Sequence, residues 1–304
     1  MTTKKELIEK INQLKKEKNA VCLVHNYQTP DIYEIADYIG DSLDLSQAAA
    51  KTDADIIVFC GVDFMAESAK ILSPKKKVLH PNRQAKCPMA QMVTPVALRE
   101  KKKQHPNAEV ACYINTTTDI KAESDICTTS ANAADVVNSI KKDRIIFVPD
   151  RNLGQYAQSQ TSKKIILWDG YCYVHDRITL ESAKKAKALH PDAELMAHPE
   201  CRPELLNLAD AVCSTSQMLT HAKKSSAKEF IVATEEGMVK RLQREFPDKK
   251  FHAIGGICTQ MKEITLHSIC ESLEKEQFEI KLDENLRKKA KTALDRMLEL
   301  RKNK

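Results

Sequence analysis

The same spaced pattern occurs in residues 87–110, which read CPMAQMVTPVALREKKKQHPNAEV, and in residues 172–195, which read CYVHDRITLESAKKAKALHPDAEL. A shift of 85 residues places Cys87 on Cys172 and aligns the threonine, the His-Pro pair and the Ala-Glu pair that follow. Cys258 starts a third copy in the same way as Cys172, because threonine and leucine follow it at the same distance. A fixed period of this kind indicates a repeat architecture.

The opening segment belongs to the same repeat, since an offset of 88 places His25 on Tyr113 and Ser42 on Ser130. The expected units are residues 1–88, 89–173 and 174–259, with C-terminal helices in residues 260–304. The last segment begins as a fourth copy, and we expect its helices to pack back onto the first unit and close a ring.

Apolar strands alternate with amphipathic helices in every unit. The expected strands are residues 21–24, 56–59 and 78–80 in the first unit, 110–113, 145–148 and 165–168 in the second, and 195–198, 230–233 and 251–254 in the third. The spacing of Ile32, Ile35 and Ile39 predicts a helix with one buried face that begins at Thr29-Pro30, and the third unit repeats this spacing. Such alternation favours parallel sheets covered on both faces. The predicted fold class is α/β, with three α/β/α units around a pseudo-three-fold axis.

Glycine is scarce, with seven in 304 residues, against roughly 7% in an average protein. Gly255 and Gly256 are adjacent, and no two glycines are separated by a single residue as in Gly-x-Gly. This rules out a dinucleotide fingerprint and a Walker-type phosphate loop, because both need glycines at fixed spacing. A protein of this composition has to bind an anion by another device.

The charge of the chain is modest and mixed, with 48 basic and 42 acidic residues giving +6. Aromatic residues make up only 5%, so the stacking platforms of nucleic-acid-binding proteins are not expected. No apolar run reaches the ~18–20 residues of a membrane span, and the charged first 19 residues resemble no signal or transit peptide. We expect a cytoplasmic protein with no nucleic-acid or membrane partner, whose ten cysteines form no disulfide framework.

Polar and reactive residues follow the predicted strands at equivalent places in the three units. They form four triplets: Cys87, Cys172 and Cys258; His25, Tyr113 and His198; Tyr27, Asn115 and Glu200; and Ser42, Ser130 and Thr215. Ligands of parallel sheets bind beyond the carboxyl ends of the strands. Three units that face one axis would bring all four triplets into one cavity.

Packing alone gives no reason for the same residue at spacings of 85 and 86, so we assign Cys87, Cys172 and Cys258 to metal binding. The other cysteines are expected in the core as small apolar residues, or behind the ligands in the case of Cys127 and Cys201. Three thiolates can hold zinc with a water, or a 4Fe-4S cluster with one free iron. A free iron can act as a Lewis acid in dehydration, so the open position points to catalysis.

Ser42, Ser130 and Thr215 are residue types that cap helix N-termini. Three helix N-termini aimed at one cavity would bind anions through backbone amides, hydroxyls and helix dipoles. This arrangement would replace the missing glycine-rich loops.

Nine segments between about residue 20 and residue 267 carry a resemblance to a known family. They are His25–Gln28, Gly40–Ser42, Val62–Glu67, Cys87–Ala90, Tyr113–Thr116, Cys127–Ala133, Trp168–His175, His198–Cys201, and Cys258 with Met261-Lys262 and Thr265-Leu266. Together they resemble the quinolinate synthases, in the form with three cysteines and no further cysteine motif near the C-terminus.

The resemblance implies condensation of iminoaspartate (iminosuccinate) with dihydroxyacetone phosphate to quinolinate, phosphate and water, in NAD biosynthesis from aspartate. It implies a 4Fe-4S cluster on Cys87, Cys172 and Cys258, with the free iron as Lewis acid. Implied roles are anion binding by Ser42, Ser130 and Thr215, orientation of substrate by His25, Asn115 and His198, and proton transfer by Tyr27, Tyr113 and Glu200. Ile114 and Pro199 are further expected substrate contacts. An aspartate oxidase or dehydrogenase that delivers iminoaspartate is a possible transient partner.

Two other classes stay open at this point. Diphthamide-forming enzymes also place one cysteine per repeat on a 4Fe-4S cluster, but they cleave S-adenosylmethionine to make a radical. A non-enzymatic iron-sulfur sensor would need a regulatory surface, for which the sequence shows no basic arm or recognition helix. A test for S-adenosylmethionine cleavage separates the first alternative from the expected reaction.

Overall fold

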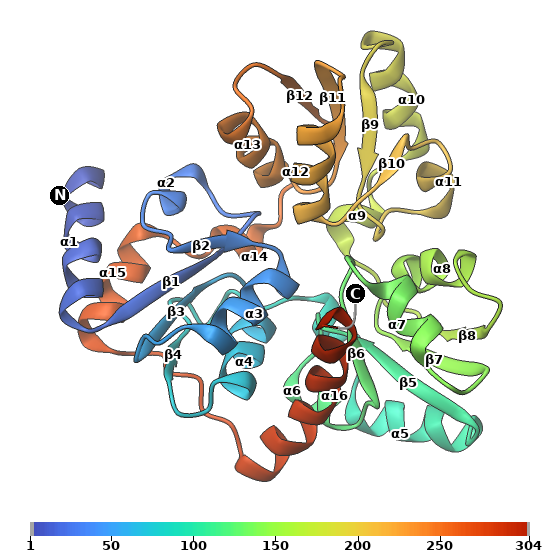
Figure 1. Cartoon of the computed structure of the whole chain (residues 1–304), viewed down its shortest axis with the longest axis horizontal. Helices are drawn as coiled ribbons and strands as arrows, with labels where there is room; N and C mark the ends of the chain where they lie inside the picture. Colours follow the sequence, from blue (N-terminus) through green and yellow to red (C-terminus); the bar gives the residue numbers. More distant parts are fainter. Residues whose placement is uncertain (1–2, 303–304) are drawn as a thin grey trace.

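Three parallel four-stranded sheets surround a common centre in the computed structural model, which describes residues 3–302 (Figure 1). In sheet order, the strands are β2 (Tyr38–Gly40), β1 (Ala20–His25), β3 (Ile56–Cys60) and β4 (Lys77–Leu79); β6 (Ile126–Thr128), β5 (Ala108–Tyr113), β7 (Arg144–Val148) and β8 (Lys164–Leu167); and β10 (Ala211–Val212), β9 (Glu194–Ala197), β11 (Glu229–Ala233) and β12 (Lys250–Ala253). The strand order is the same in all three sheets. The predicted α/β class with three repeated units is confirmed.

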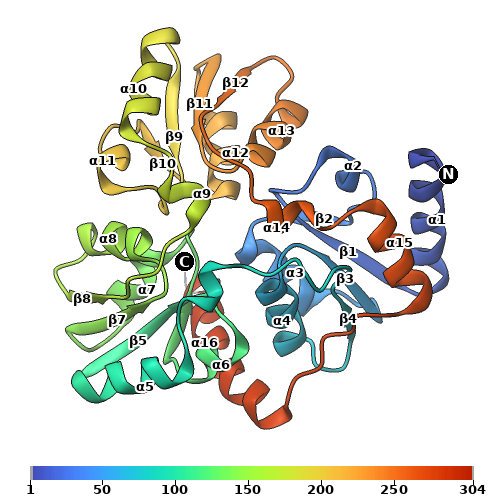
Figure 2. The ribbon, with the colours of Figure 1, turned by 180° about the vertical axis from the view of Figure 1, so that it is seen from behind.

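Helices connect and cover these strands. They are α1 (Lys4–Glu17), α2 (Pro30–Tyr33), α3 (Ser42–Lys51) and α4 (Asp63–Leu72); α5 (Pro95–Gln104), α6 (Thr118–Ala122), α7 (Ala133–Ser139) and α8 (Arg151–Ser159); α9 (Tyr173–Asp176), α10 (Leu180–Leu189), α11 (Pro203–Leu206), α12 (Thr215–Lys224) and α13 (Glu236–Glu245); and α14 (Thr259–Lys262), α15 (Leu266–Lys275) and α16 (Glu284–Lys302), with a 3-10 turn at Met89–Gln91. Seen from behind, the three lobes meet where the carboxyl ends of the strands converge (Figure 2).

The sequence analysis missed one edge strand in each sheet. The helix expected through Ile39 ends at Tyr33, and residues 38–40 instead form β2 beside β1. The helix α11 is equally short and is followed by β10. The helical spacing of apolar residues was misleading here because the residues just beyond a short helix pack on the same core while forming a strand.

An aspartate before each edge strand explains why the chain turns into a strand there. Asp37, Asp125 and Asp210 each accept a hydrogen bond, 2.7 Å long, from a backbone N–H of the first strand of the same unit. In return, the backbone N–H of each aspartate donates to the carbonyl oxygen of the same first-strand residue, at 2.9–3.1 Å. We call these residues the strand aspartates. Each one pins the edge strand at its amino end.

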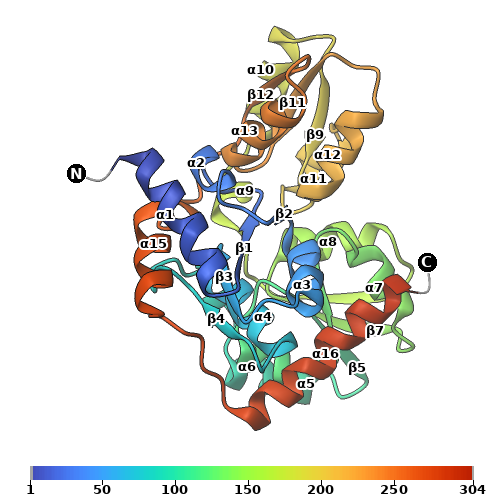
Figure 3. The same ribbon diagram turned by 60° about the vertical axis from the view of Figure 1, so that its left-hand side comes forward.

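The C-terminal helices contact two different units. The helix α15 lies against α1, on the outside of the first sheet (Figure 3). The helix α16 packs on α6 and β6 of the second unit and buries Ala293, Leu294 and Met297 there completely. Arg287 of α16 also donates to the carbonyl oxygen of Ile71 at the end of α4. The division of the chain at residues 88, 173 and 259 stays a prediction.

Most cysteines belong to the core, as the sequence analysis expected. Seven are buried and three are half-buried, and the half-buried ones are Cys87, Cys172 and Cys258. Along residues 3–302, no helix combines the length and the apolar character that crossing a membrane requires.

Candidate active site

One cavity lies between the three units, where their strands end. All twelve residues of the four triplets predicted from the repeat line it: His25, Tyr27, Ser42, Cys87, Tyr113, Asn115, Ser130, Cys172, His198, Glu200, Thr215 and Cys258. Ile114 and Pro199 are not among the lining side chains, and Ile114 is 1% exposed in the core. The convergence of the four triplets follows from the shared topology of the sheets.

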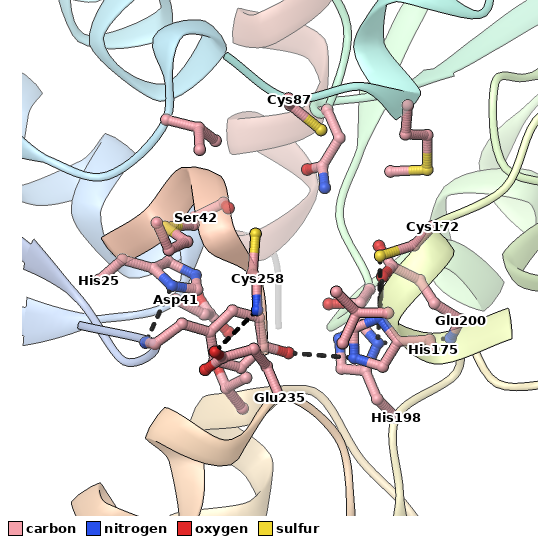
Figure 4. A pocket seen from close by; sticks show the side chains of 18 of the residues that line it. His25, Asp41, Ser42, Cys87, Cys172, His175, His198, Glu200, Glu235 and Cys258 are labelled. Carbon is pink, nitrogen blue, oxygen red and sulfur yellow. Dashed lines mark hydrogen bonds and ion pairs between the residues drawn. The ribbon is translucent and has the colours of Figure 1, made fainter. Parts of the chain in front are cut away.

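The three cysteines of the repeat reach this cavity from three sides (Figure 4). Burial raises the pKa of each thiol, so each prefers its neutral form unless a cation is nearby. Among residues 3–302, no group of ligand atoms within 4.8 Å of one another contains all three sulfurs. Sulfurs that share one tetrahedral zinc lie about 3.8 Å apart, because each Zn–S bond is about 2.3 Å. The three sulfurs therefore do not form one compact ligand set of the kind that a single zinc ion needs.

Two histidines at equivalent strand ends are held in the same tautomer. Nδ1 of His25 accepts a hydrogen bond from the backbone N–H of Tyr27 at 3.2 Å. Nδ1 of His198 accepts one from the backbone N–H of Glu200 at 3.3 Å. Burial lowers the pKa of both imidazoles to about 3, with Lys262 adding to the effect at His25 and His175 at His198. Both rings are thus neutral near pH 7 and carry their proton on Nε2, as hydrogen-bond donors.

A chain of hydrogen bonds joins Tyr27 to Glu200 across two units. The Tyr27 hydroxyl lies 2.7 Å from Oγ1 of Thr234, which lies 2.8 Å from Nε2 of His175. Nδ1 of His175 lies 2.6 Å from Oε2 of Glu200 and 3.2 Å from Sγ of Cys172. With Nδ1–H donating to the carboxylate, Nε2 accepts from Thr234, and Thr234 accepts from Tyr27. The arrangement can pass a proton between the phenol and the carboxylate.

Glu200 keeps its negative charge although it is buried. Burial by itself would raise the pKa of Glu200, but the interaction with His175, including its hydrogen bond, and the hydrogen bond from Tyr113 outweigh burial and lower it. Burial raises the pKa of Tyr27 and of Tyr113 well above the ordinary phenol value, and the charge of Glu200 adds to this. The site therefore combines one carboxylate with two phenols that retain their protons.

Two buried oxygens in the cavity have no hydrogen-bond partner among the described residues. They are Oε1 of Glu200 and Oδ1 of Asn115. A buried polar group left without a partner costs roughly 1–3 kcal/mol. Both residues line the cavity, so these oxygens are placed to receive a polar ligand.

Comparison with known proteins agrees with this geometry. The family model described as Quinolinate synthetase A protein matches residues 9–299. Over 295 residues, 96% of this chain and 97% of the relative, the chain is 52% identical to a quinolinate synthase of Methanosarcina barkeri (strain Fusaro / DSM 804). The chain belongs to the quinolinate synthase family. It is also 51% identical to a quinolinate synthase of Alkaliphilus metalliredigens (strain QYMF) and 52% to one of Geobacter sp. (strain M21), each over 298 residues, 97% of this chain and 98% of the relative. The chain is thus an enzyme of this family, which acts in NAD biosynthesis.

In this member of the quinolinate synthase family, the predicted helix N-caps are wrong. Ser42 and Thr215 are the first residues of α3 and α12, and the caps are Asp41 and Ser214. Ser130 lies before α7, whose N-cap residue is Asn132. The error arose because capping residue types stand next to one another, so residue type does not fix the cap.

The change of cap brings an acidic group into the wall of the cavity. The Asp41 carboxylate accepts from the N–H groups of Leu43 and Asp44. Burial, followed by the charge of Asp44, raises the pKa of Asp41 to about 6. At neutral pH this carboxylate opposes an anion near the start of α3, so the anion site is less positive than three free helix ends would be.

Reasoning from triplets missed His175, which the structure places at the centre of the hydrogen-bond chain. His175 follows Cys172 by three residues, whereas Ala90 and Met261 take that place after Cys87 and Cys258. The repeat therefore gave no signal. The Cys-x-x-His spacing, which puts both side chains at the start of α9, was the signal that could have found it.

Proposed function

We propose that this enzyme condenses iminoaspartate with dihydroxyacetone phosphate to give quinolinate, phosphate and water. The observation that carries the proposal is the convergence of Cys87, Cys172 and Cys258, one from each unit, on a cavity that also holds neutral imidazole and phenol donors. The names of the relatives, at about half identity over nearly the whole chain, support the same reaction.

The residues present fit a 4Fe-4S cluster held by Cys87, Cys172 and Cys258. Each thiol comes from a different unit, which suits a cluster in which each thiolate binds a different iron. Their raised pKa values mean that a nearby cation is needed to keep them as thiolates. When bound, such a cluster supplies a free iron as Lewis acid for the loss of hydroxide.

The neutral groups orient the substrates. His25 and His198 each present Nε2–H as a donor to a carbonyl or carboxylate oxygen. Asn115, with its unpaired Oδ1, accepts from an imine or hydroxyl hydrogen. We place the carboxylates or the phosphate near Ser42, Ser130 and Thr215, which line the cavity.

Proton transfer falls to Tyr27, Tyr113 and Glu200. Condensation with loss of water needs a base to remove a proton from carbon and an acid to protonate a leaving oxygen. The ionised Glu200 is the base. Tyr27 and Tyr113, which keep their protons, are the acids, and His175 with Thr234 returns protons between Tyr27 and Glu200.

The reaction is tested on protein purified without oxygen and loaded with iron and sulfide. We expect iron and sulfide in the ratio of one 4Fe-4S cluster per chain, a brown absorbance, and quinolinate formation only when both substrates are present. Loaded protein that forms no quinolinate, or that instead cleaves S-adenosylmethionine, would overturn the proposal.

The surroundings of the enzyme follow from this chemistry. The thiols must stay reduced, which supports a cytoplasmic location. Iminoaspartate hydrolyses readily as an imine, so transient contact with the aspartate oxidase or dehydrogenase that makes it would limit its loss. Addition of such a partner should raise the yield of quinolinate per iminoaspartate formed.

A further inference from the structure

A carboxylate holds the backbone of each cysteine in the cavity. Asp63 Oδ1 accepts from the N–H of Cys87 at 3.1 Å, Asp150 Oδ2 from Cys172 at 3.0 Å, and Glu235 Oε1 from Cys258 at 3.0 Å. We call these three the cysteine-loop carboxylates. The proposed reaction gives none of them a role, and Asp63 and Asp150 are not among the residues that line the cavity.

The carboxylate that makes this contact does not have the same place and length in all three units. Asp63 is the first residue of α4, whereas Asp150 and Glu235 are the N-caps of α8 and α13. Glutamate is also one methylene longer than aspartate. Inheritance from one repeat would preserve the residue and its position. Here the residue differs between Asp150 and Glu235, and the position differs at Asp63, yet the bond to the cysteine amide is kept. The contact itself is therefore the conserved feature of the three units.

Each carboxylate also accepts from the start of its own helix. Asp63 binds the N–H of Phe64 at 2.9 Å, Asp150 that of Leu153 at 2.7 Å, and Glu235 that of Gly237 at 2.7 Å. Asp150 and Glu235 are completely buried. Each group thus joins two segments, the helix that follows the third strand and the loop that carries the cysteine after the fourth.

We propose that Asp63, Asp150 and Glu235 are positioning residues that hold the three thiols at the spacing needed by the metal centre. The inference rests on the proposed cluster. A loop that is free before binding must lose conformational entropy when its thiolate is bound. A loop that a carboxylate already holds against a helix loses less entropy on binding. Groups behind metal ligands commonly act in this way, and their removal weakens metal binding 10–100-fold.

The test compares Asp63→Ala with Asp63→Asn. Oδ1 of Asp63 accepts from both Cys87 and Phe64, so the single amide oxygen of asparagine can keep both contacts, whereas alanine removes them. After loading with iron and sulfide, release of iron to a chelator should be about 10–100 times faster in Asp63→Ala and close to wild type in Asp63→Asn. The measurement needs no turnover, so it does not depend on the reaction.

Two matched controls separate positioning from general loss of stability. Asp210→Ala removes a carboxylate that accepts from a strand amide, that of Leu195 at 2.7 Å, away from the cysteines. Thr179→Ala removes the N-cap of α10, which accepts from Ser182. Both variants should hold iron like wild type. If Asp63→Ala does not fold, the same measurement on Asp150→Ala tests the contact with Cys172.

The outcomes distinguish this inference from the proposed function. A wild-type protein that takes up no cluster would overturn both. The positioning role alone would be overturned by a loaded wild type together with a folded Asp63→Ala variant that keeps its iron equally long. Control variants that lose iron as fast as Asp63→Ala would overturn it as well.

Discussion

At the amino ends of the sheets the strand aspartates, which are exposed or half-buried, close hydrogen bonds with the first strand, whereas at the carboxyl ends several buried polar groups have no partner among the described residues. Asp37, Asp125 and Asp210 each close two hydrogen bonds with one residue of the first strand. Oxygens without a partner among the described residues follow the first strands at the other end: Asn26 Oδ1, Gln28 Oε1, Asn115 Oδ1 and Glu200 Oε1. Since each unpaired group costs roughly 1–3 kcal/mol, the carboxyl ends keep open groups that stability alone would pair. One end of the fold is arranged for stability and the other for binding.

The strongest challenge to this comparison is removal of a thiol at the carboxyl end. Cys172→Ala should abolish the brown absorbance and quinolinate formation, because the two remaining cysteines cannot hold the cluster without the third thiolate. The matched control is Cys270→Ala, which removes a buried cysteine of α15 outside the cavity and should keep both. Normal activity of Cys172→Ala would remove the cluster from the mechanism.

Loss of the carboxylate base should have the next largest effect. Glu200→Gln keeps the size of the side chain but removes its charge, so turnover should fall at least ~10²-fold, as is typical for a general acid or base. Iron content should stay at the wild-type level. Steady-state rates with both substrates check the first point, and near-normal turnover would take Glu200 out of this role.

At the amino end, the same kind of change should affect stability and leave the chemistry intact. Asp210→Ala leaves the buried amide of Leu195 without its acceptor, so the free energy of unfolding should fall by roughly 1–3 kcal/mol. Denaturation in urea measures this loss. A fall in turnover of the folded variant would contradict the separation of the two ends.

Removal of an ion pair at the amino end of the first sheet should have the smallest effect. Glu276 contacts Lys18 and Lys77, whose hydrogen bonds lower the pKa of this half-exposed carboxyl to about 2. The pairing stabilises the fold above the ordinary carboxyl pKa of about 4.3 and is lost as the pH falls toward 2. Glu276→Gln should therefore cost about 0–1 kcal/mol at pH 7, and its difference from wild type should shrink toward pH 3. A difference that does not change with pH would contradict the ion pair.

The repeat made much of the fold and site predictable, because residues at a fixed period must occupy equivalent places in the sheets. It led from Cys87, Cys172 and Cys258 to the cavity. It failed where the units differ, as at His175, or where different positions reach the same contact, as for Asp63 and Asp150. The short edge strands were missed because each strand aspartate fixes one of them through a hydrogen bond to a residue 15 positions earlier in the chain. Such a contact leaves no trace in local periodicity.

The position of α16 constrains how the chain can complete its fold during synthesis. The surface of α6 and β6 that receives Leu294 and Met297 belongs to the second unit, yet residues 284–302 are made only after the whole third unit. Until then the ribosome-bound chain carries an uncovered apolar face, and such faces promote aggregation. Closing this contact across more than half of the chain also makes it one of the slower steps of folding, so the last helix determines when the second unit is finished.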